Sequence, residues 1–145
     1  MERLPVGVVV VNWNGGALLD ACLDALDPQG ASRLLVVDNG SEPDEVRRLA
    51  NRDGVFVLPL GANRGFAPAS NAGAVDARLK ALPFLAFVNN DAVLEPGYLA
   101  ACVAALEADP GLSAVQGVVL DADGTRVDGL GLGWNRRHEA VQLGH

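Results

Sequence analysis

Aromatic residues are scarce in this sequence: they make up 5% of its 145 positions, although half of all residues are apolar. The core must therefore be built mainly from valine, leucine and alanine, a balance that suits strands covered by alanine-rich helices. No apolar run reaches the length of a membrane-spanning helix or of a secretory signal. The length is typical of one domain with a substantial core. We therefore expect an α/β domain in the cytoplasm.

Basic residues are outnumbered by acidic ones, 11 to 18, which gives a net charge of −7. A chain without a basic stripe has little with which to replace the counterions of a nucleic acid or of an anionic membrane. No nucleic-acid partner is expected, and the two basic pairs, Arg47-Arg48 and Arg136-Arg137, are predicted to be solvated. A phosphate-bearing ligand would need a metal ion, or a local arginine together with backbone N–H groups.

Cysteine and histidine are also rare, with two of each. Cys22 and Cys102 lie far apart inside apolar helical patterns, so we predict buried free thiols rather than a disulfide or a redox pair. His138 and His145 have no partners at metal-ligand spacing. The glycine motifs of dinucleotide-binding folds and of P-loop enzymes are absent, and so is the serine motif of esterases. These absences weigh against all three of those enzyme classes.

Short apolar runs alternate with helical patterns over the first 120 residues. This alternation predicts right-handed β-α-β units and a mostly parallel, doubly wound α/β sheet with helices on both faces. Ligands of such sheets bind at the carboxyl ends of the strands. The expected strands are residues 6–11, 34–37, 55–60, 84–88 and 112–120. The expected helices are residues 18–26, 43–50, 67–82 and 96–108.

The pattern changes after residue 120. Residues 121–124 carry a turn signal, and 125–127 are expected to return as a short antiparallel strand. Glycine and leucine then alternate from Gly129 onwards. We predict a ligand-binding α/β domain over residues 1–128 and a glycine-rich tail over 129–145.

A single carboxylate follows the fourth apolar run. Asp91 comes directly after two amides, Asn89 and Asn90. An isolated anion at the end of a strand suits one hard divalent cation that is held partly by the protein and partly by a phosphate-bearing substrate. The alternative is a polar turn that caps the next helix.

The second and third strands also end in polar residues. Asp38 and Asn39 offer acceptors to a nucleobase imide N–H or to a ribose hydroxyl, with the Asp38 side chain in a solvent-filled crevice. The alternative is a turn into the next helix. Arg64, followed by the flexible Gly65, suits a diphosphate because its planar fork donates twice. Asn71 lies further along the alanine-rich helix, where by itself it would be an ordinary helix residue.

Four segments, in this order, resemble the signatures of one enzyme family. They are residues 8–15 (Val-Val-Val-Val-Asn-Trp-Asn-Gly), 35–41 (Leu-Val-Val-Asp-Asn-Gly-Ser), 63–73 (Asn-Arg-Gly-Phe-Ala-Pro-Ala-Ser-Asn-Ala-Gly) and 87–91 (Phe-Val-Asn-Asn-Asp). Together they are similar to the family-two inverting glycosyltransferases of the GT-A fold, and most similar to the rhamnosyltransferase-like branch. The resemblance covers residues 6–120.

The resemblance implies a nucleotide-diphosphate-sugar donor that is UDP- or dTDP-linked. Asp91 would be the metal ligand, for Mn²⁺ or Mg²⁺. Asn89 stands where the family's D-x-D motif has its first acid, which leaves one charged ligand. The residues implied to bind the nucleotide sugar are Asn12, Trp13, Asn14, Asp38, Asn39, Arg64, Gly65, Asn71, Asn89 and Asn90.

The family's general base has no counterpart in this sequence. Inverting transfer needs a base to take the proton of the acceptor hydroxyl, and in the family that carboxylate follows a further strand and a Gly-Gly-Phe-Asp-like segment. Asp121, Asp123, Asp128 and Glu139 match no family motif. The resemblance therefore implies a donor-binding half whose base lies beyond His145.

The leading hypothesis is a glycosyltransferase of cell envelope polysaccharide biosynthesis, with this chain inactive on its own and any peripheral membrane contact made through the missing part. The alternative is a non-catalytic module that binds a nucleotide sugar or a partner subunit. A weaker alternative is a flavodoxin-like small-molecule domain. The sequence names neither the sugar nor the acceptor, and it leaves open whether the chain forms a homodimer.

Overall fold

The computed structural model describes residues 3–121, 123–130, 132–134, 137 and 140–142. The chain divides into two compact units, residues 1–103 and 104–145. This division by contacts falls before the expected functional boundary at residue 128, which stays a prediction. Predictions made for Arg136, His138, Glu139 and His145 lie outside the described residues. In the described part of the chain, no helix is both long and apolar enough to span a lipid bilayer.

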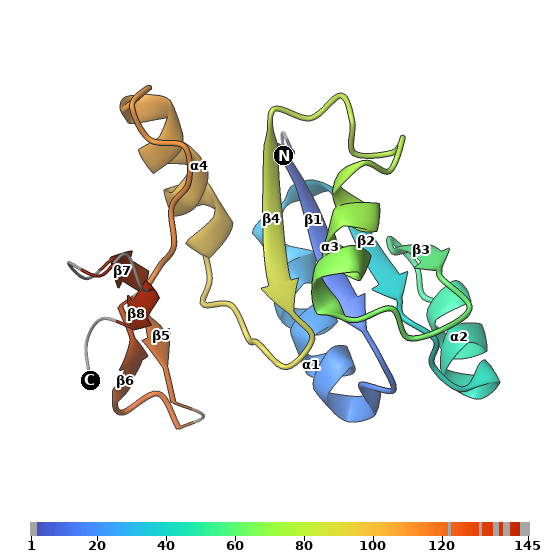
Figure 1. The fold of residues 1–145 in the computed structure, drawn as a ribbon. Coiled ribbons are helices and arrows are strands. Elements are labelled where there is room, and N and C mark those ends of the chain that lie inside the picture. Colours follow the sequence, from blue (N-terminus) through green and yellow to red (C-terminus); the bar gives the residue numbers. More distant parts are fainter. Residues whose placement is uncertain (1–2, 122, 131, 135–136, 138–139, 143–145) are drawn as a thin grey trace. The chain divides into compact units, whose positions relative to one another are not determined.

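The first unit is built on a four-stranded parallel sheet (Figure 1). Its strands are β1 (Leu4–Asn12), β2 (Ala31–Asp38), β3 (Phe56–Pro59) and β4 (Phe84–Asn89). They lie in the order β3-β2-β1-β4, and each neighbouring pair is parallel. All four strands were predicted from their apolar runs. Because they are parallel, their carboxyl ends meet at one edge of the sheet, and the strand order reverses between β1 and β4.

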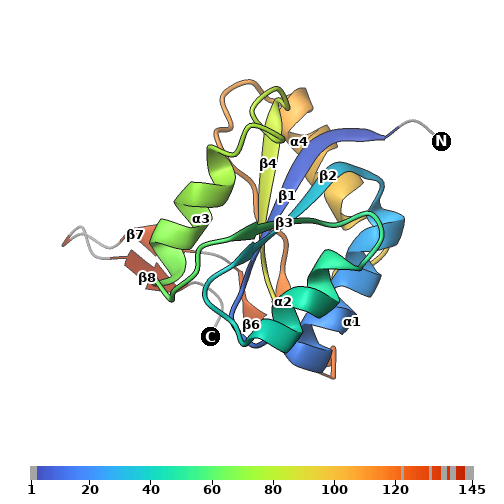
Figure 2. The same ribbon diagram turned by 90° about the vertical axis from the view of Figure 1, so that its right-hand side faces the viewer.

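Helices cover both faces of this sheet, as predicted. The helices are α1 (Gly16–Leu26), α2 (Pro43–Ala50), α3 (Phe66–Ala74) and α4 (Tyr98–Ala108), and a short 3-10 turn, η1 (Asp27–Gln29), follows α1. Figure 2 shows α3 on one side of the strands and α1 with α2 on the other. The doubly wound α/β architecture is therefore confirmed.

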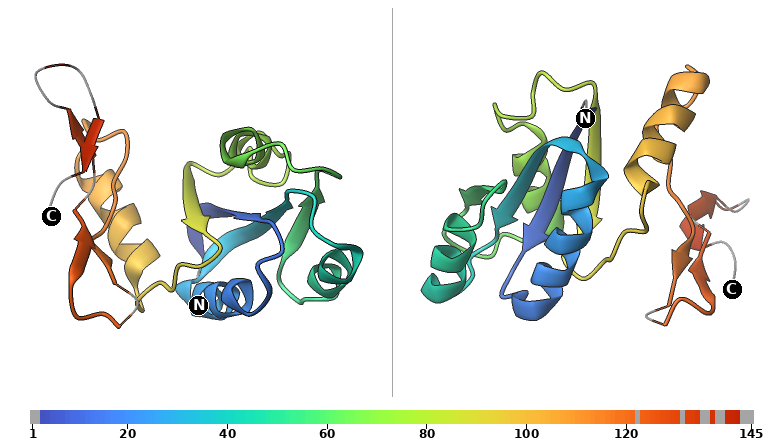
Figure 3. Two further views of the ribbon diagram at one scale, coloured as in Figure 1. Left: turned by 60° about the horizontal axis from the view of Figure 1, so that its bottom comes forward. Right: turned by 180° about the vertical axis from the view of Figure 1, so that it is seen from behind.

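Two aliphatic clusters form the core, one on each face of the sheet. The left view of Figure 3 shows α3 (green) on one side of the strands and α1 (blue) on the other. Successive side chains of a strand point to opposite faces, so Val8 and Val10 pack with α1 while Val9 packs on the side of α3. Among the described residues, every apolar side chain in the buried core belongs to Val, Leu, Ala or Cys. This confirms the core expected from the scarcity of aromatic residues. Cys22 is buried, Cys102 is half-buried, and both thiols are free, as predicted.

Gly73 lets α3 lie close to the sheet. A Cβ at this position would lie 2.6 Å from Cγ1 of Val9 and 2.9 Å from Cγ2 of Val37. No side chain fits in that space, so the distance between helix and sheet depends on this glycine. This contact lies in the last turn of α3, the helix whose first residue, Phe66, bears on the site described below.

The helix predicted over residues 67–82 is wrong in its second half. The helix α3 ends at Ala74, and the chain continues through turns in which Leu79 N donates to Asp76 O and Leu82 N donates to Leu79 O. The Asp76 carboxylate accepts from both the backbone N–H and the guanidinium of Arg78. A short acidic side chain that binds nearby backbone in this way favours a turn over a continuing helix.

The second unit contains two short antiparallel pairs. Strand β5 (Val119–Leu120) pairs with β6 (Val127–Gly129), and β7 (Leu132–Trp134) pairs with β8 (Ala140–Gln142). The predicted turn is confirmed by the hydrogen bond from Gly124 N to Asp121 O. A short antiparallel strand does return, but over 127–129 instead of the predicted 125–127. The predicted strand 112–120 is wrong except for its last two residues. A β-prone run becomes a strand only where it joins a ladder, and in this run the described ladder with β6 involves Val119 and Leu120.

Candidate functional site

A cavity of about 280 Å³ opens in the first unit at the carboxyl edge of the sheet. Its lining comes from the ends of β1, β2 and β4, from the loop after β3 and from the first residue of α3. This is where the strand order reverses, which is the usual ligand site of an open α/β sheet. The lining residues are Val11, Trp13, Asn39, Asn63, Phe66 and Asn90.

Two aromatic side chains and three carboxamides make up most of this lining. Trp13 and Phe66 are each 58% exposed. Exposed rings beside amides suit a planar ligand with a polar edge, because the rings can stack on its faces while the amides bind its edge. Trp13 was predicted to be a site residue, whereas Phe66 was not.

A buried amide joins the end of β2 to the loop before α3. Asn39 is 3% exposed. Its Oδ1 accepts from Arg64 N at 2.9 Å, and its Nδ2 donates to Asn63 Oδ1 at 3.1 Å and to Gly65 O at 3.4 Å. Asn63 Oδ1 also accepts from Gly65 N at 2.9 Å. The loop that carries Asn63 and Phe66 to the cavity is thus held in place by Asn39.

Asp38 is buried, at 2% exposure. Both of its carboxylate oxygens lie within 3.4 Å of the backbone N–H of Ser41, which donates to them. The expectation that its side chain occupies a solvent-filled crevice is wrong, and the alternative of a turn into the next helix describes the contact that it makes. Its role toward a ligand stays a prediction.

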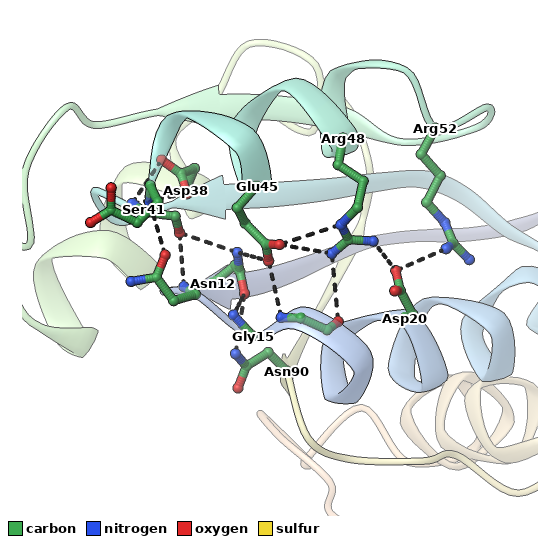
Figure 4. Close-up of polar contacts among 12 residues, drawn as sticks. Asn12, Gly15, Asp20, Asp38, Ser41, Glu45, Arg48, Arg52 and Asn90 are labelled. Atoms are coloured by element: carbon green, nitrogen blue, oxygen red, sulfur yellow. Dashed lines mark hydrogen bonds and ion pairs between the residues drawn. The ribbon is translucent and has the colours of Figure 1, made fainter.

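Asn12 is fully buried, and its whole side chain is engaged within the protein (Figure 4). Its Oδ1 accepts from Gly15 N at 3.1 Å and from Asn90 Nδ2 at 3.2 Å. Its Nδ2 donates to Glu45 Oε1 at 3.2 Å and to Ser41 Oγ at 3.4 Å. Asn12 therefore supports the end of β1 and has no donor left for a ligand.

Asn14 also braces this end of β1. Its Oδ1 accepts from Glu42 N at 2.8 Å, and its own N–H donates to Ser41 Oγ at 2.9 Å. It is the one described non-glycine residue in the left-handed region, with φ of 50°, a conformation that asparagine tolerates better than most residues. Of the three predicted residues in this segment, only Trp13 lines the cavity.

Glu45 connects α2 to the end of β1, and it was not predicted to be a site residue. Its Oε1 accepts from Gly16 N at 3.1 Å, and its Oε2 pairs with Arg48 at 3.0 Å. Burial disfavours the charged form, but hydrogen bonds from Arg48, Gly16 and Asn12 outweigh burial and hold the Glu45 pKa below its usual value. Arg48 is in turn paired with Asp20. No sequence signal could have given these partners, because they come from distant positions.

Three predicted site residues do not line the cavity. Arg64 and Gly65 belong to the loop before α3, and Asn71 belongs to α3 itself. The Arg64 guanidinium donates to Leu60 O at 3.0 Å. Gly65 precedes α3 with φ of 86°, where only glycine is unstrained. Asn71 is exposed on α3. These three predicted roles stay predictions.

Asn89, Asn90 and Asp91 follow one another at the end of β4. Asn90 lines the cavity, and Asn89 and Asp91 are exposed. Burial, and secondly the charge of Asp91, raise the pKa of the Cys22 thiol to about 11, so this cysteine stays protonated at neutral pH. Its Sγ donates to Asn89 O at 3.4 Å.

Asp91 is the one carboxylate of this end of β4 that a cation could use. Among the described residues, no three His, Cys, Asp or Glu side chains gather as a ligand set. One carboxylate with neighbouring amide oxygens is a hard but incomplete donor set. It fits a Mn²⁺ or Mg²⁺ ion that takes its other ligands from a phosphate and from water.

A larger hollow of about 420 Å³ lies elsewhere in the first unit. Its charged lining is Asp24, Asp27, Asp53 and Arg52, and the arginine is already paired with Asp20 and Asp24. Three carboxylates would repel a phosphate group. None of the residues that line this hollow lies at the carboxyl end of a strand. We therefore assign the candidate site to the smaller cavity.

The fold and the sequence were compared with those of known proteins. The fold is similar to the crystal structure of S. aureus TarS 1-349, with a TM-score of 0.56 and 18% sequence identity over 83% of this chain and 40% of that chain. The chain thus spans less than half the length of that structure. No curated protein matches the chain. The model of the family "Glycosyl transferase family 2" matches residues 7–142, nearly the whole chain. The rhamnosyltransferase-like branch stays a prediction. The chain has the GT-A fold and belongs to glycosyl transferase family 2.

Proposed function

We propose that the cavity binds the nucleotide of a UDP- or dTDP-linked sugar, and that the whole protein transfers this sugar to an acceptor with inversion. The observation that carries the proposal is the make-up of the cavity. Two exposed rings, Trp13 and Phe66, stand with three carboxamides at the point where the strand order reverses. Stacking on both rings would hold a nucleobase, and the amides of Asn63 and Asn90 would bind its edge or the ribose.

The diphosphate would extend from the cavity toward the end of β4. Asp91, with the amide oxygen of Asn89, would hold a Mn²⁺ or Mg²⁺ ion there. When bound, such an ion supplies charge neutralisation for the departing diphosphate. Arg64 is a second candidate partner, provided that its guanidinium leaves Leu60 O. Asp38 and Asn39 would then act chiefly by shaping the turn and the loop that surround the nucleotide.

The proton of the acceptor hydroxyl needs a base, and we propose that neither Asp121 nor Asp123 serves. Asp121 accepts from the backbone N–H groups of Thr125 and Arg126, and Asp123 accepts from Thr125. Hydrogen bonds from the Thr125 hydroxyl and backbone N–H hold the Asp123 pKa below its usual value, which weakens it as a base. The acceptor, an envelope polysaccharide, and the cytoplasmic location are part of the same proposal.

Calorimetric titration of UDP and dTDP in the presence of Mn²⁺ tests the assignment of the cavity. Trp13→Ala and Phe66→Ala should each weaken binding by about 1–3 kcal/mol, the usual effect of losing one stacking partner. Phe56→Ala is a matched control, because it removes an exposed phenyl from β3 that does not line the cavity, and it should leave the affinity unchanged. Undiminished binding by both cavity variants would show that the nucleotide does not occupy this site.

A further inference from the structure

We propose that Glu45 is a positioning residue that sets the hydrogen-bonding polarity of the cavity: through Asn12 it turns the Asn90 amide so that the oxygen, not the nitrogen, faces the ligand. Glu45 does not line the cavity and touches no part of it directly. The identity of the ligand rests on the proposed function, whereas the orientation of the amides rests on contacts within the protein.

The chain of contacts begins at the Glu45 carboxylate. An ionised carboxylate accepts hydrogen bonds and donates none. Arg48 occupies Oε2, and Gly16 N and Asn12 Nδ2 converge on Oε1. Whichever group of Asn12 faces Glu45 must therefore be an N–H.

A second contact fixes the same orientation of Asn12 from the opposite side. The backbone N–H of Gly15 points at Asn12 Oδ1, 3.1 Å away. Turning the amide over would set its oxygen against the Glu45 carboxylate and its NH₂ against this N–H. Both changes are repulsive inside a buried site, where an unmade hydrogen bond costs most.

Asn12 passes the orientation on to Asn90. Because Asn12 Oδ1 is an acceptor, the group of Asn90 that meets it at 3.2 Å must be the NH₂. Figure 4 shows the Asn90 nitrogen turned toward Asn12 and its oxygen turned away. Gly15 leaves room for this contact, since a Cβ there would lie 2.5 Å from Asn12 Oδ1 and 2.8 Å from Asn90 Nδ2.

The amide of Asn63, also in the lining, is fixed in the opposite sense. Its Oδ1 is taken by Gly65 N and Asn39 Nδ2, which leaves its NH₂ for a ligand. These two amides thus present one acceptor, Asn90 Oδ1, and one donor, Asn63 Nδ2, to the cavity. The ligand group that meets Asn90 is therefore a hydrogen-bond donor, such as the imide N–H of uracil or thymine or a ribose hydroxyl.

The orientation can be tested without a ligand by NMR of the side-chain amides. Arg48 and Asn12 each donate to a different oxygen of the Glu45 carboxylate. Glu45→Gln keeps the shape of the side chain but offers only one acceptor oxygen. It should shift the Asn90 side-chain NH₂ resonances although the two residues make no contact. Asp20→Asn, which removes another partner of Arg48 and leaves the Asn12 contact intact, should not shift them. If the Asn90 resonances do not move in Glu45→Gln, the proposal is overturned. If Glu45→Gln does not fold, Glu45→Ala is used in its place with the same expected shift.

The effect on the ligand is tested by a double-mutant cycle with UDP. Glu45→Gln should weaken UDP binding about tenfold in the wild-type background and have almost no effect in the Asn90→Ala background. Equal losses in both backgrounds would mean that Glu45 affects UDP binding independently of Asn90, which contradicts the proposal. 3-Methyl-UDP and 3′-deoxy-UDP distinguish the donors, because only the analogue that lacks the relevant donor should abolish the coupling. If wild-type protein binds no UDP, the proposed function fails, while the Asn90 resonances still decide the orientation.

Discussion

The buried carboxamide of Asn39 donates to Asn63 Oδ1 at 3.1 Å and so ties the end of β2 to the loop that enters α3. The same side chain accepts from Arg64 N and donates to Gly65 O. One residue therefore holds three consecutive residues of the loop. Both Asn63 and Phe66 reach the cavity from this loop and the start of its helix.

Asn39→Ala should lower the free energy of unfolding by about 1–3 kcal/mol, because it leaves Arg64 N–H and Asn63 Oδ1 without their buried partner. Urea denaturation measures this change. Asn71→Ala is the control: it removes an exposed amide from α3 and should change stability by no more than about 0.5 kcal/mol. Equal effects of the two substitutions would show that the loop does not depend on Asn39.

Stability should depend on pH through Glu45. Its pKa in the folded protein lies below its usual value, so between the two values the unfolded chain binds more protons and stability rises with pH. The stabilisation is present in full above the ordinary glutamate pKa of about 4.3 and is lost as the pH falls through the lower folded value. Unfolding free energies of wild type and Glu45→Gln, measured from about pH 3 to pH 6, should therefore converge at the acid end. A difference that does not change with pH would contradict this.

Nucleoside diphosphate binding should depend on a divalent cation and on Asp91. The argument is electrostatic: a protein of net charge −7 with one carboxylate at the end of β4 cannot hold a diphosphate there without a cation. Calorimetry with UDP should give measurable binding with Mn²⁺ or Mg²⁺, and binding at least about tenfold weaker without metal or in Asp91→Asn. Asp53→Asn, an exposed carboxylate of the other hollow, is the control. If the affinity for UDP depends on neither the metal nor Asp91, no bound cation takes part in nucleotide binding.

The 145-residue chain, assayed alone, should bind a nucleotide sugar but transfer the sugar to no acceptor. A positioned base contributes about 10²–10⁴-fold to such a rate, and Asp121 and Asp123 are engaged in their own turn. The assay is acceptor-dependent release of nucleoside diphosphate. Release that Asp91→Ala abolishes would show that Asp121, Asp123, Asp128 or Glu139 is the base after all.

The strands and most helices could be predicted because their signals are local. Apolar runs mark all four strands of the sheet, and Pro43 followed by two acidic residues marks the start of α2, whose bounds match the prediction. The end of α3 could not be predicted from the alanine-rich sequence, because the Asp76–Arg78 contact stops the helix there. Residues 112–118 look like a strand, but the strand that the structure has there, β5, begins at Val119.

The location of the site could also be predicted, because parallel strands bring their carboxyl ends together. Which side chains face the cavity could not. Asn12 and Trp13 are neighbours, yet Asn12 is buried against Glu45 and Asn90 while Trp13 is exposed. The partners of Asn12 lie 33 and 78 positions away in the sequence, so only the fold reveals that Asn12 supports the site instead of lining it.

The central claim, that the nucleotide occupies the cavity at the carboxyl edge of the sheet, is tested most directly by mapping UDP in the presence of Mg²⁺ with ¹H–¹⁵N NMR. The account predicts that the indole N–H of Trp13 and the side-chain amides of Asn63 and Asn90 shift together as UDP is added. Shifts confined to the hollow around Asp24, Asp27 and Asp53, or no shifts at all, would contradict it.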